Sequence, residues 1–184
     1  SPRICYRSVT SQRPLMSAKD VPAIAPESKD TLAAFGASQT QLEPIGAAVR
    51  GLNLASPTPP PARVVQALEY IMAERGCVVF KNESTLAAKG LLQASCWWGG
   101  KELHSTHDVH PATPGGNPNL FRFSNDHHHG IKGVGPQWHN NGSFNTDTFS
   151  HAGYHMVRAP EQGGGTHFAL QAAAFDALQP ELKT

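Results

Sequence analysis

The most informative segment of the sequence runs from Asn119 to Leu170. Its three informative segments read NLFRFSNDHHHG (119–130), GPQWHNNGSF (135–144) and GGGTHFAL (163–170). All ten histidines of the chain lie between His104 and His167. Histidine is the commonest metal ligand and the usual acid or base near neutral pH. Their concentration here indicates that the chemistry of the protein lies in this stretch.

The whole chain has the composition of one globular domain. It has 184 residues, of which 39% are hydrophobic and 16% are charged, as in ordinary soluble domains. A formal net charge of +1 gives no reason to expect a nucleic-acid partner, and no apolar run is long enough for a transmembrane segment. The 17 glycines and 15 prolines favour a loop-rich β architecture over a helix bundle.

The three cysteines are an odd number without CxxC spacing: Cys5, Cys77 and Cys96. Cys77 leads an apolar run and Cys96 precedes two tryptophans, so we expect both to be buried thiols. This pattern favours a reducing compartment without disulfides.

Residues 1–30 carry no periodic apolar pattern and are expected to form an extended or disordered N-terminal arm. Up to Lys19 the segment has four basic residues and no acidic one. This composition resembles the remnant of an organelle-targeting segment, for a plastid or a mitochondrion. The alternative is an arm of the same kind in any compartment, including the cytoplasm.

Hydrophobic periodicity predicts the order strand, helix, strand, helix, followed by several strands. We expect strands over 45–54, 77–80, 120–123, 154–157 (or from 149) and 165–170, and helices over 62–75, 85–95 and 171–178. Residues 31–42 are ambiguous, with a short helix as one interpretation. Val64, Leu68 and Ile71 share one helical face, and Gly76 suits the C-terminal cap. The order predicts a mainly β fold with flanking helices.

The segment Trp138-His139-Asn140-Asn141 has nearly the form of an iron-binding motif. A His-x-Asp pair at a strand end projects an imidazole and a carboxylate to the same side, because alternate residues share a face. A distant second histidine completes a facial triad that leaves iron positions open for a co-substrate and O₂. Here position 141 holds asparagine, which offers a neutral carbonyl oxygen in place of a carboxylate.

Together with its neighbours, this segment resembles the TauD/TfdA family, the taurine-dioxygenase-like iron(II)/2-oxoglutarate oxygenases. Matching motifs are spread over much of the chain in the family's order: 45–54, 75–81, 98–104, 123–125, 138–139, 163–166 and 172–178. The resemblance implies that residues 31–184 form the N-terminal portion of a TauD-like domain, which is a partial double-stranded β-helix, or jelly roll.

The resemblance also implies roles for individual residues and for cofactors. His139 would ligate Fe(II), Thr166 would contact a carboxylate of 2-oxoglutarate, Asn125 would lie near this co-substrate, and His104 would face the substrate. The family's distal histidine and 2-oxoglutarate-binding arginine come far downstream of the threonine. No residue of this chain is assigned to them, and we expect the C-terminal half of the domain to be absent.

The other histidines have alternative interpretations. His127, His128 and His129 are expected to form a solvated loop, with a metal or substrate contact as the alternative. His151 and His155 are four residues apart, so a strand would place them on one face. A zinc site there would need two further ligands.

Two function classes remain open from the sequence. The first is an iron(II)/2-oxoglutarate-dependent dioxygenase that hydroxylates a small molecule. The second, which Asn141 favours, is a degenerate and non-catalytic relative that acts as a structural or assembly subunit with protein partners in a larger complex. Fold and function separate in this way in many families.

Overall fold

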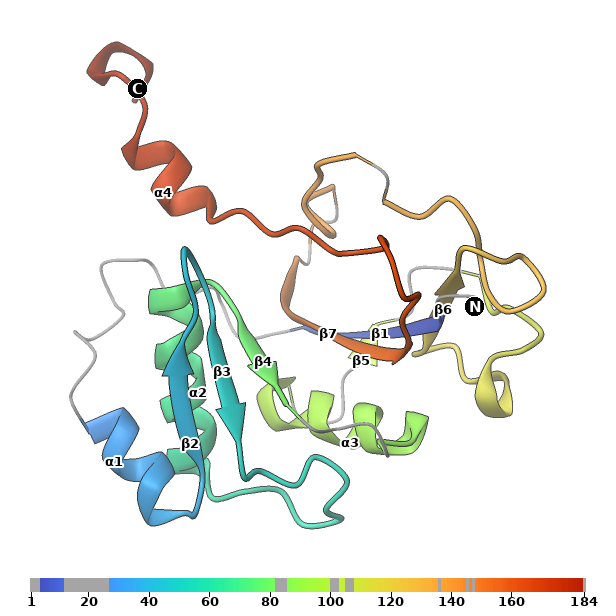
Figure 1. Cartoon of the computed structure of the whole chain (residues 1–184), viewed down its shortest axis with the longest axis horizontal. Coiled ribbons are helices and arrows are strands. Elements are labelled where there is room, and N and C mark those ends of the chain that lie inside the picture. The colour runs from blue at the N-terminus through green and yellow to red at the C-terminus, as the bar shows by residue number, and fades with distance from the viewer. Residues whose placement is uncertain are drawn as a thin grey trace. The chain divides into compact units, whose positions relative to one another are not determined.

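The computed structural model describes residues 4–11, 27–81, 86–99, 103–104, 108–135, 137–144, 146 and 148–183; for residues 4–11, 27, 99 and 104 it describes the backbone alone. These residues form two compact units (Figure 1). Unit 1 comprises residues 1–17, 53–60 and 83–164, and unit 2 comprises residues 18–52, 61–82 and 165–184.

Unit 2 is built on a three-stranded mixed sheet. Its strands are β2 (Ser38–Gln41), β3 (Ala47–Arg50) and β4 (Val78–Phe80), with β3 in the centre, antiparallel to β2 and parallel to β4. Helices α1 (Glu27–Ala34) and α2 (Ala62–Arg75) pack against each other and against this sheet. The parallel step from β3 to β4 through α2 is the usual crossover, in which the helix covers one face of the sheet.

The core of unit 2 confirms the predicted helix over 62–75. The five largest fully buried side chains of the described residues all lie in this unit: Leu32, Val49, Val64, Leu68 and Ile71. Three of them come from the predicted apolar face of α2, because residues three and four apart lie on one side of a helix. Gly76 ends the helix with φ +82°, a left-handed conformation that glycine adopts without steric cost.

Three expectations about unit 2 need correction. The strand over 77–80 exists as β4, but its side chains are half-buried to exposed, because β4 lies at an edge of the sheet. Cys77, expected to be buried, is likewise half-buried, and so is Cys96 in unit 1. Burial still raises the pKa of both thiols above the ordinary value.

The predicted strand over 45–54 is shorter in the structure, where it forms β3. It ends there because the chain turns at Gly51, where φ is +86°.

Unit 1 is built on a four-stranded antiparallel sheet around β1 (Ile4–Ser11). The strand β7 (Phe149–Arg158) pairs along the whole of β1. On the opposite edge, β6 (Phe121–Ser124) pairs with the first half of β1 and β5 (Leu103–His104) with the second half. Helix α3 (Ala88–Gly99) contacts β1 and β7, and the short 3₁₀ helix η1 (Pro114–Gly116) lies between β5 and β6 in sequence.

The N-terminal segment differs from the expected arm in two respects, because residues 4–11 form a strand and residues 27–30 begin helix α1. Residues 4–11 are extended, as predicted, but they form the strand that joins β5, β6 and β7. Periodicity did not predict this strand, because its sequence ICYRSVTS alternates poorly between apolar and polar residues. The remaining residues up to 26 lie outside the described part of the chain.

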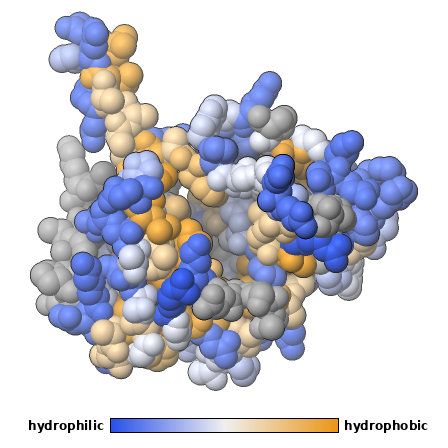
Figure 2. Space-filling view, in the orientation of Figure 1, coloured by the Kyte–Doolittle hydropathy of each residue, from blue (hydrophilic) through white to orange (hydrophobic). Residues whose placement is uncertain are grey.

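The C-terminal part of the described chain is mostly exposed. The predicted helix over 171–178 is confirmed as α4 (Gln171–Asp176), which is followed by the 3₁₀ helix η2 (Pro180–Leu182). Figure 2 shows hydrophobic and hydrophilic residues side by side on this segment, where Phe175 and Leu182 are exposed. The predicted strand over 165–170 is wrong: these residues form a loop, because no described strand pairs with them.

The fold class agrees with the expectation at a coarse level. The described residues form one antiparallel sheet and one mixed sheet, with helices packed beside them. None of the described helices combines the length and the apolar character that crossing a bilayer demands.

Candidate functional site

The segment that carries the iron-like motif is a loop in unit 1. Residues 137–141 have no regular secondary structure, so the expected placement of the motif at a strand end is wrong. Trp138 is 72% exposed, and His139 and Asn140 are exposed as well, whereas Asn141 is half-buried. Because this segment is not a strand, the rule that alternate residues share a face does not apply to His139 and Asn141. Each of these two residues is held by its own hydrogen bond.

A backbone contact orients the imidazole of His139. Its Nδ1 lies 2.7 Å from the carbonyl oxygen of Gln137. A carbonyl oxygen only accepts, so Nδ1 carries the proton of this hydrogen bond, and Nε2 of the neutral ring keeps its lone pair. A hydrogen bond from the other ring nitrogen to a backbone carbonyl is the usual way in which proteins orient a metal-binding histidine.

A glycine makes room for the same ring. Gly135 has φ +62°, and a Cβ added there would lie 2.8 Å from Cε1 of His139. Real Cβ atoms essentially never come so close to another heavy atom. Gly135 therefore contributes both its left-handed backbone and its missing side chain to the position of His139.

The amide of Asn141 is tied to the sheet. Its Nδ2 donates a hydrogen bond to the hydroxyl oxygen of Tyr154 in β7, at 2.8 Å. Next to it, Gly142 is buried, and a Cβ at that position would collide with the ring of Phe149 at the start of β7. A polar contact and a packing contact therefore fasten the loop to β7.

The remaining residues with predicted roles are distributed over both units. Asn125 is exposed at the end of β6 in unit 1, and Thr166 is exposed in unit 2. The backbone of His104 lies in β5 opposite Val9. The side chain of His104, on which its predicted role depends, lies outside the described part of the structure. His107 lies outside it as well.

His151 and His155 belong to the packing of unit 1. The burial pattern of β7 places both on the covered side of the strand, as predicted, while Tyr154 and Met156 are exposed between and beside them. The ring of His151 stacks on Trp98 of α3, with centroids 5.4 Å apart. His151 thus helps α3 to cover the sheet.

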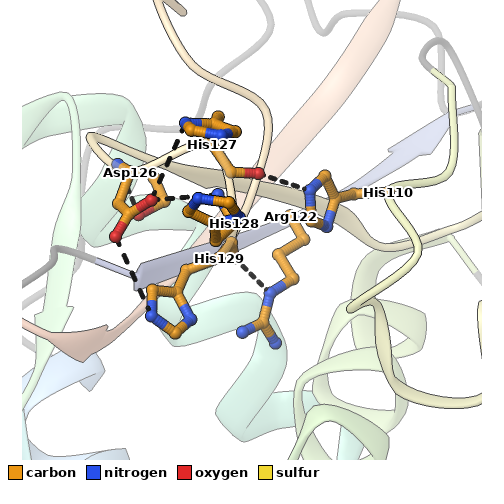
Figure 3. Close-up of polar contacts among 7 residues, drawn as sticks. His110, Arg122, Asp126, His127, His128 and His129 are labelled. Atoms are coloured by element: carbon orange, nitrogen blue, oxygen red, sulfur yellow. Dashed lines mark hydrogen bonds and ion pairs between the residues drawn. The ribbon is translucent and has the colours of Figure 1, made fainter.

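A second group of polar residues gathers in the loop after β6, at Asp126, His127, His128 and His129. We call residues 126–129 the histidine loop. Figure 3 shows their side chains around the carboxylate of Asp126. One oxygen of this carboxylate lies 4.0 Å from Nδ1 of His127, and the other lies 3.9 Å from Nε2 of His129. The expected solvated loop exists, but it is an ordered turn with a charged centre.

The carboxylate of Asp126 is stabilised in its charged form. The pKa of Asp126 lies below its ordinary value, first because Oδ1 accepts a hydrogen bond from the backbone N–H of His128, at 2.9 Å. The positive charge of neighbouring imidazoles lowers the pKa further. The sequence alone gave one signal for this group, which is the direct succession of an aspartate and three histidines.

Comparison with known proteins gives one match. The family model described as "Taurine catabolism dioxygenase TauD, TfdA family" matches residues 38–184. No curated protein and no solved structure matches the chain.

Proposed function

Because the chain belongs to the TauD/TfdA family, we propose that it is a dioxygenase-type domain with a degenerate iron position. In this proposal it acts as a non-catalytic structural or assembly subunit of a larger complex. The observation that carries the proposal is Asn141, which stands where the family's motif has its carboxylate and whose amide donates to Tyr154.

The donor set of the motif loop does not fit an iron(II) centre. His139 offers a suitable imidazole nitrogen, but position 141 offers a neutral carbonyl oxygen, and a hard or borderline dication favours a carboxylate there. Defects in groups that merely orient metal ligands typically cost about 10–100-fold in affinity. Loss of the charge of a direct ligand is expected to cost at least as much, so iron and 2-oxoglutarate chemistry is not assigned to this chain.

A second candidate function is an iron(II)/2-oxoglutarate-dependent dioxygenase that acts on a small molecule. One observation favours it. The hydrogen bond from Nδ1 of His139 to the carbonyl of Gln137 leaves Nε2 available, as in a working metal ligand. In this candidate function, Thr166 and Asn125 serve 2-oxoglutarate and His104 faces the substrate, as the family resemblance implies.

The deciding experiment restores the charge at position 141. A form of the protein that carries the family's distal histidine, and its Asn141→Asp variant, are titrated anaerobically with Fe(II) in the presence of 2-oxoglutarate, and the charge-transfer absorbance is recorded. We expect weak binding by the unmodified protein and at least about 10–100-fold tighter binding by the variant. Tyr154 does not oppose the change, because a hydroxyl that accepts from an amide also donates to a carboxylate.

A matched control adds the same charge one residue away. Asn140 is exposed, and its Oδ1 accepts from the hydroxyl of Ser143. We expect Asn140→Asp to leave iron binding weak. Tight binding by the unmodified protein would overturn the proposal and establish the dioxygenase. A gain in Asn140→Asp equal to that in Asn141→Asp would mean that general charge, and not the ligand position, governs binding.

The subunit part of the proposal is tested on the native protein. We expect it to migrate in a complex of larger mass when it is purified under mild conditions and analysed by native mass spectrometry. A native protein found as a free monomer would contradict the assembly role. The basic N-terminal composition supports a plastid or a mitochondrion as the location, which fractionation of the source cells tests.

A further inference from the structure

We propose that Asp126, His127 and His128 form a binding site for a divalent transition-metal ion of the zinc or nickel class. The site is distinct from the motif loop at His139, and it does not depend on the proposed function. Imidazole nitrogens together with one carboxylate are ligands that zinc, nickel and copper favour.

The three residues bring one potential ligand atom each into a small volume. A carboxylate oxygen of Asp126 and one ring nitrogen each from His127 and His128 all lie within 4.8 Å of one another. Bonds from zinc to nitrogen or oxygen are about 2.0–2.2 Å long, so two ligands of one ion lie at most about 4 Å apart. His127 and His128 are exposed, so small rotations of their side chains bring the ligand atoms to the separation that one ion requires.

The backbone of the histidine loop is fixed from outside. The backbone N–H of Ala112 donates to Nδ1 of His110 at 3.1 Å, so the proton of this neutral ring lies on Nε2. Nε2 of His110 then donates to the carbonyl oxygen of His127 at 2.9 Å (Figure 3). This contact holds the peptide between two of the proposed ligands in one orientation.

Further hydrogen bonds close the turn. Nε of Arg122 donates to the carbonyl oxygen of His129 at 2.5 Å, and the backbone N–H of His129 donates to the carbonyl oxygen of Asp126 at 3.0 Å. The turn also requires glycine at position 130, because a Cβ there would lie 2.7 Å from the backbone of Phe123. A loop that is ordered before binding loses less conformational entropy when it takes up an ion.

The charge of the turn suits a cation at neutral pH. The same backbone hydrogen bond that shapes the turn keeps the Asp126 carboxylate ionised. Neutral imidazoles add lone pairs without adding charge, so an ion held by all three ligands is partly neutralised. Because protons compete with the metal for imidazole, binding is expected to weaken in acid.

Consecutive histidines bind nickel in any flexible peptide, and the experiment separates that chemistry from a built site. Zn(II) and Ni(II) are titrated by calorimetry into the folded protein and into a synthetic peptide of residues 124–131. We expect one equivalent to bind the protein at least tenfold more tightly than the peptide. Equal affinity would overturn the proposal.

Variants identify the ligands. We expect Asp126→Asn, His127→Ala and His128→Ala each to lower the affinity at least tenfold, while His167→Ala, an exposed histidine of unit 2, leaves it unchanged. The two histidine variants keep the backbone bonds of the turn, and circular dichroism verifies that each variant is folded. Unchanged affinity in both histidine variants would overturn the site, as would Co(II) absorbance that is identical with and without Asp126.

Discussion

Nδ2 of Asn141 lies 2.8 Å from the hydroxyl oxygen of Tyr154, which joins the motif loop to strand β7. An amide nitrogen has only hydrogens to offer, so the carbonyl oxygen of Asn141 points to the other side of the amide group. The side chain of Asn141 is therefore used as a structural donor.

Removing the Tyr154 hydroxyl is expected to loosen the motif loop. Tyr154→Phe should lower the free energy of unfolding by about 0.5–1.5 kcal/mol, near the lower end because the ring is partly exposed. Tyr70→Phe is the control, since its hydroxyl accepts from Nε2 of Gln66 on the surface of α2 at 3.2 Å, and should cost about 0.2–0.5 kcal/mol. Urea unfolding measures both, and equal losses would contradict the fastening role.

Filling the space beside His139 is expected to move its ring. Gly135→Ala places a methyl group against Cε1 and also strains a backbone with positive φ. Gly133→Ala carries a similar φ of +77° with no atom within 4 Å, so it reports the backbone cost alone, about 1 kcal/mol. Nitrogen NMR of the His139 ring should change in the first variant only. An unchanged ring spectrum in Gly135→Ala would refute the contact.

A similar pair of glycines tests unit 2. A Cβ at Gly51 would lie 2.5 Å from the carbonyl oxygen of Gly36, whereas a Cβ at Gly36 would meet nothing within 4 Å. Their φ values are similar, +86° and +79°. Gly51→Ala should therefore destabilise the unit by about 1–3 kcal/mol more than Gly36→Ala, as overpacking usually does. Thermal unfolding followed by circular dichroism compares them.

Arg75 holds the turn between β2 and β3. Its guanidinium donates to the carbonyl oxygens of Leu42 at 2.7 Å, Pro44 at 3.2 Å and Gly46 at 3.4 Å. Arg75→Ala should cost about 1.5–3 kcal/mol, because these bonds have a charged donor. Arg63→Ala, at an exposed position of the same helix, should stay within about 0.5 kcal/mol. Similar losses in the two variants would disprove the role of Arg75.

The titration of Asp126 makes the stability of the fold depend on pH, and its lowered pKa means that stability falls in acid. A carboxyl whose pKa is lower in the folded protein stabilises the fold above its unfolded pKa, and this stabilisation is lost as the pH falls through the folded pKa. The ordinary value is 3.8, so the loss begins near there and is complete only in stronger acid. Carbon NMR of the Asp126 carboxyl should show a midpoint below 3.8. Replacing all three histidines of the loop by asparagine should raise it only part of the way, because the backbone hydrogen bond remains.

Helices with strong local signals were predictable from the sequence. The face formed by Val64, Leu68 and Ile71 fixed α2, and Gly76 fixed its end, because both signals depend on residues close in sequence. The family assignment was also predictable, since several short motifs came in one order, and the family match over residues 38–184 confirms it.

Features that depend on distant partners were not predictable in the same way. Residues 4–11 form a strand only because β5, β6 and β7 offer hydrogen bonds, and residues 165–170 have a strand-like pattern but no described partner. The histidine loop is solvated, as expected, with His127 and His128 exposed, but its order was not predicted. Its order depends on His110 and Arg122, whose contacts with it periodicity does not report.

The pairing of β1 with β7 has a consequence for biosynthesis. β1 leaves the ribosome first, but the strand that pairs along its whole length ends at Arg158. The three described strands of unit 2 have all emerged once Phe80 has left the ribosome. Translation proceeds at about 5–20 residues per second, so β1 waits roughly 7–30 seconds for β7 with an unpaired edge. The nascent chain is thus most in need of chaperone protection between the emergence of β4 and the arrival of β7.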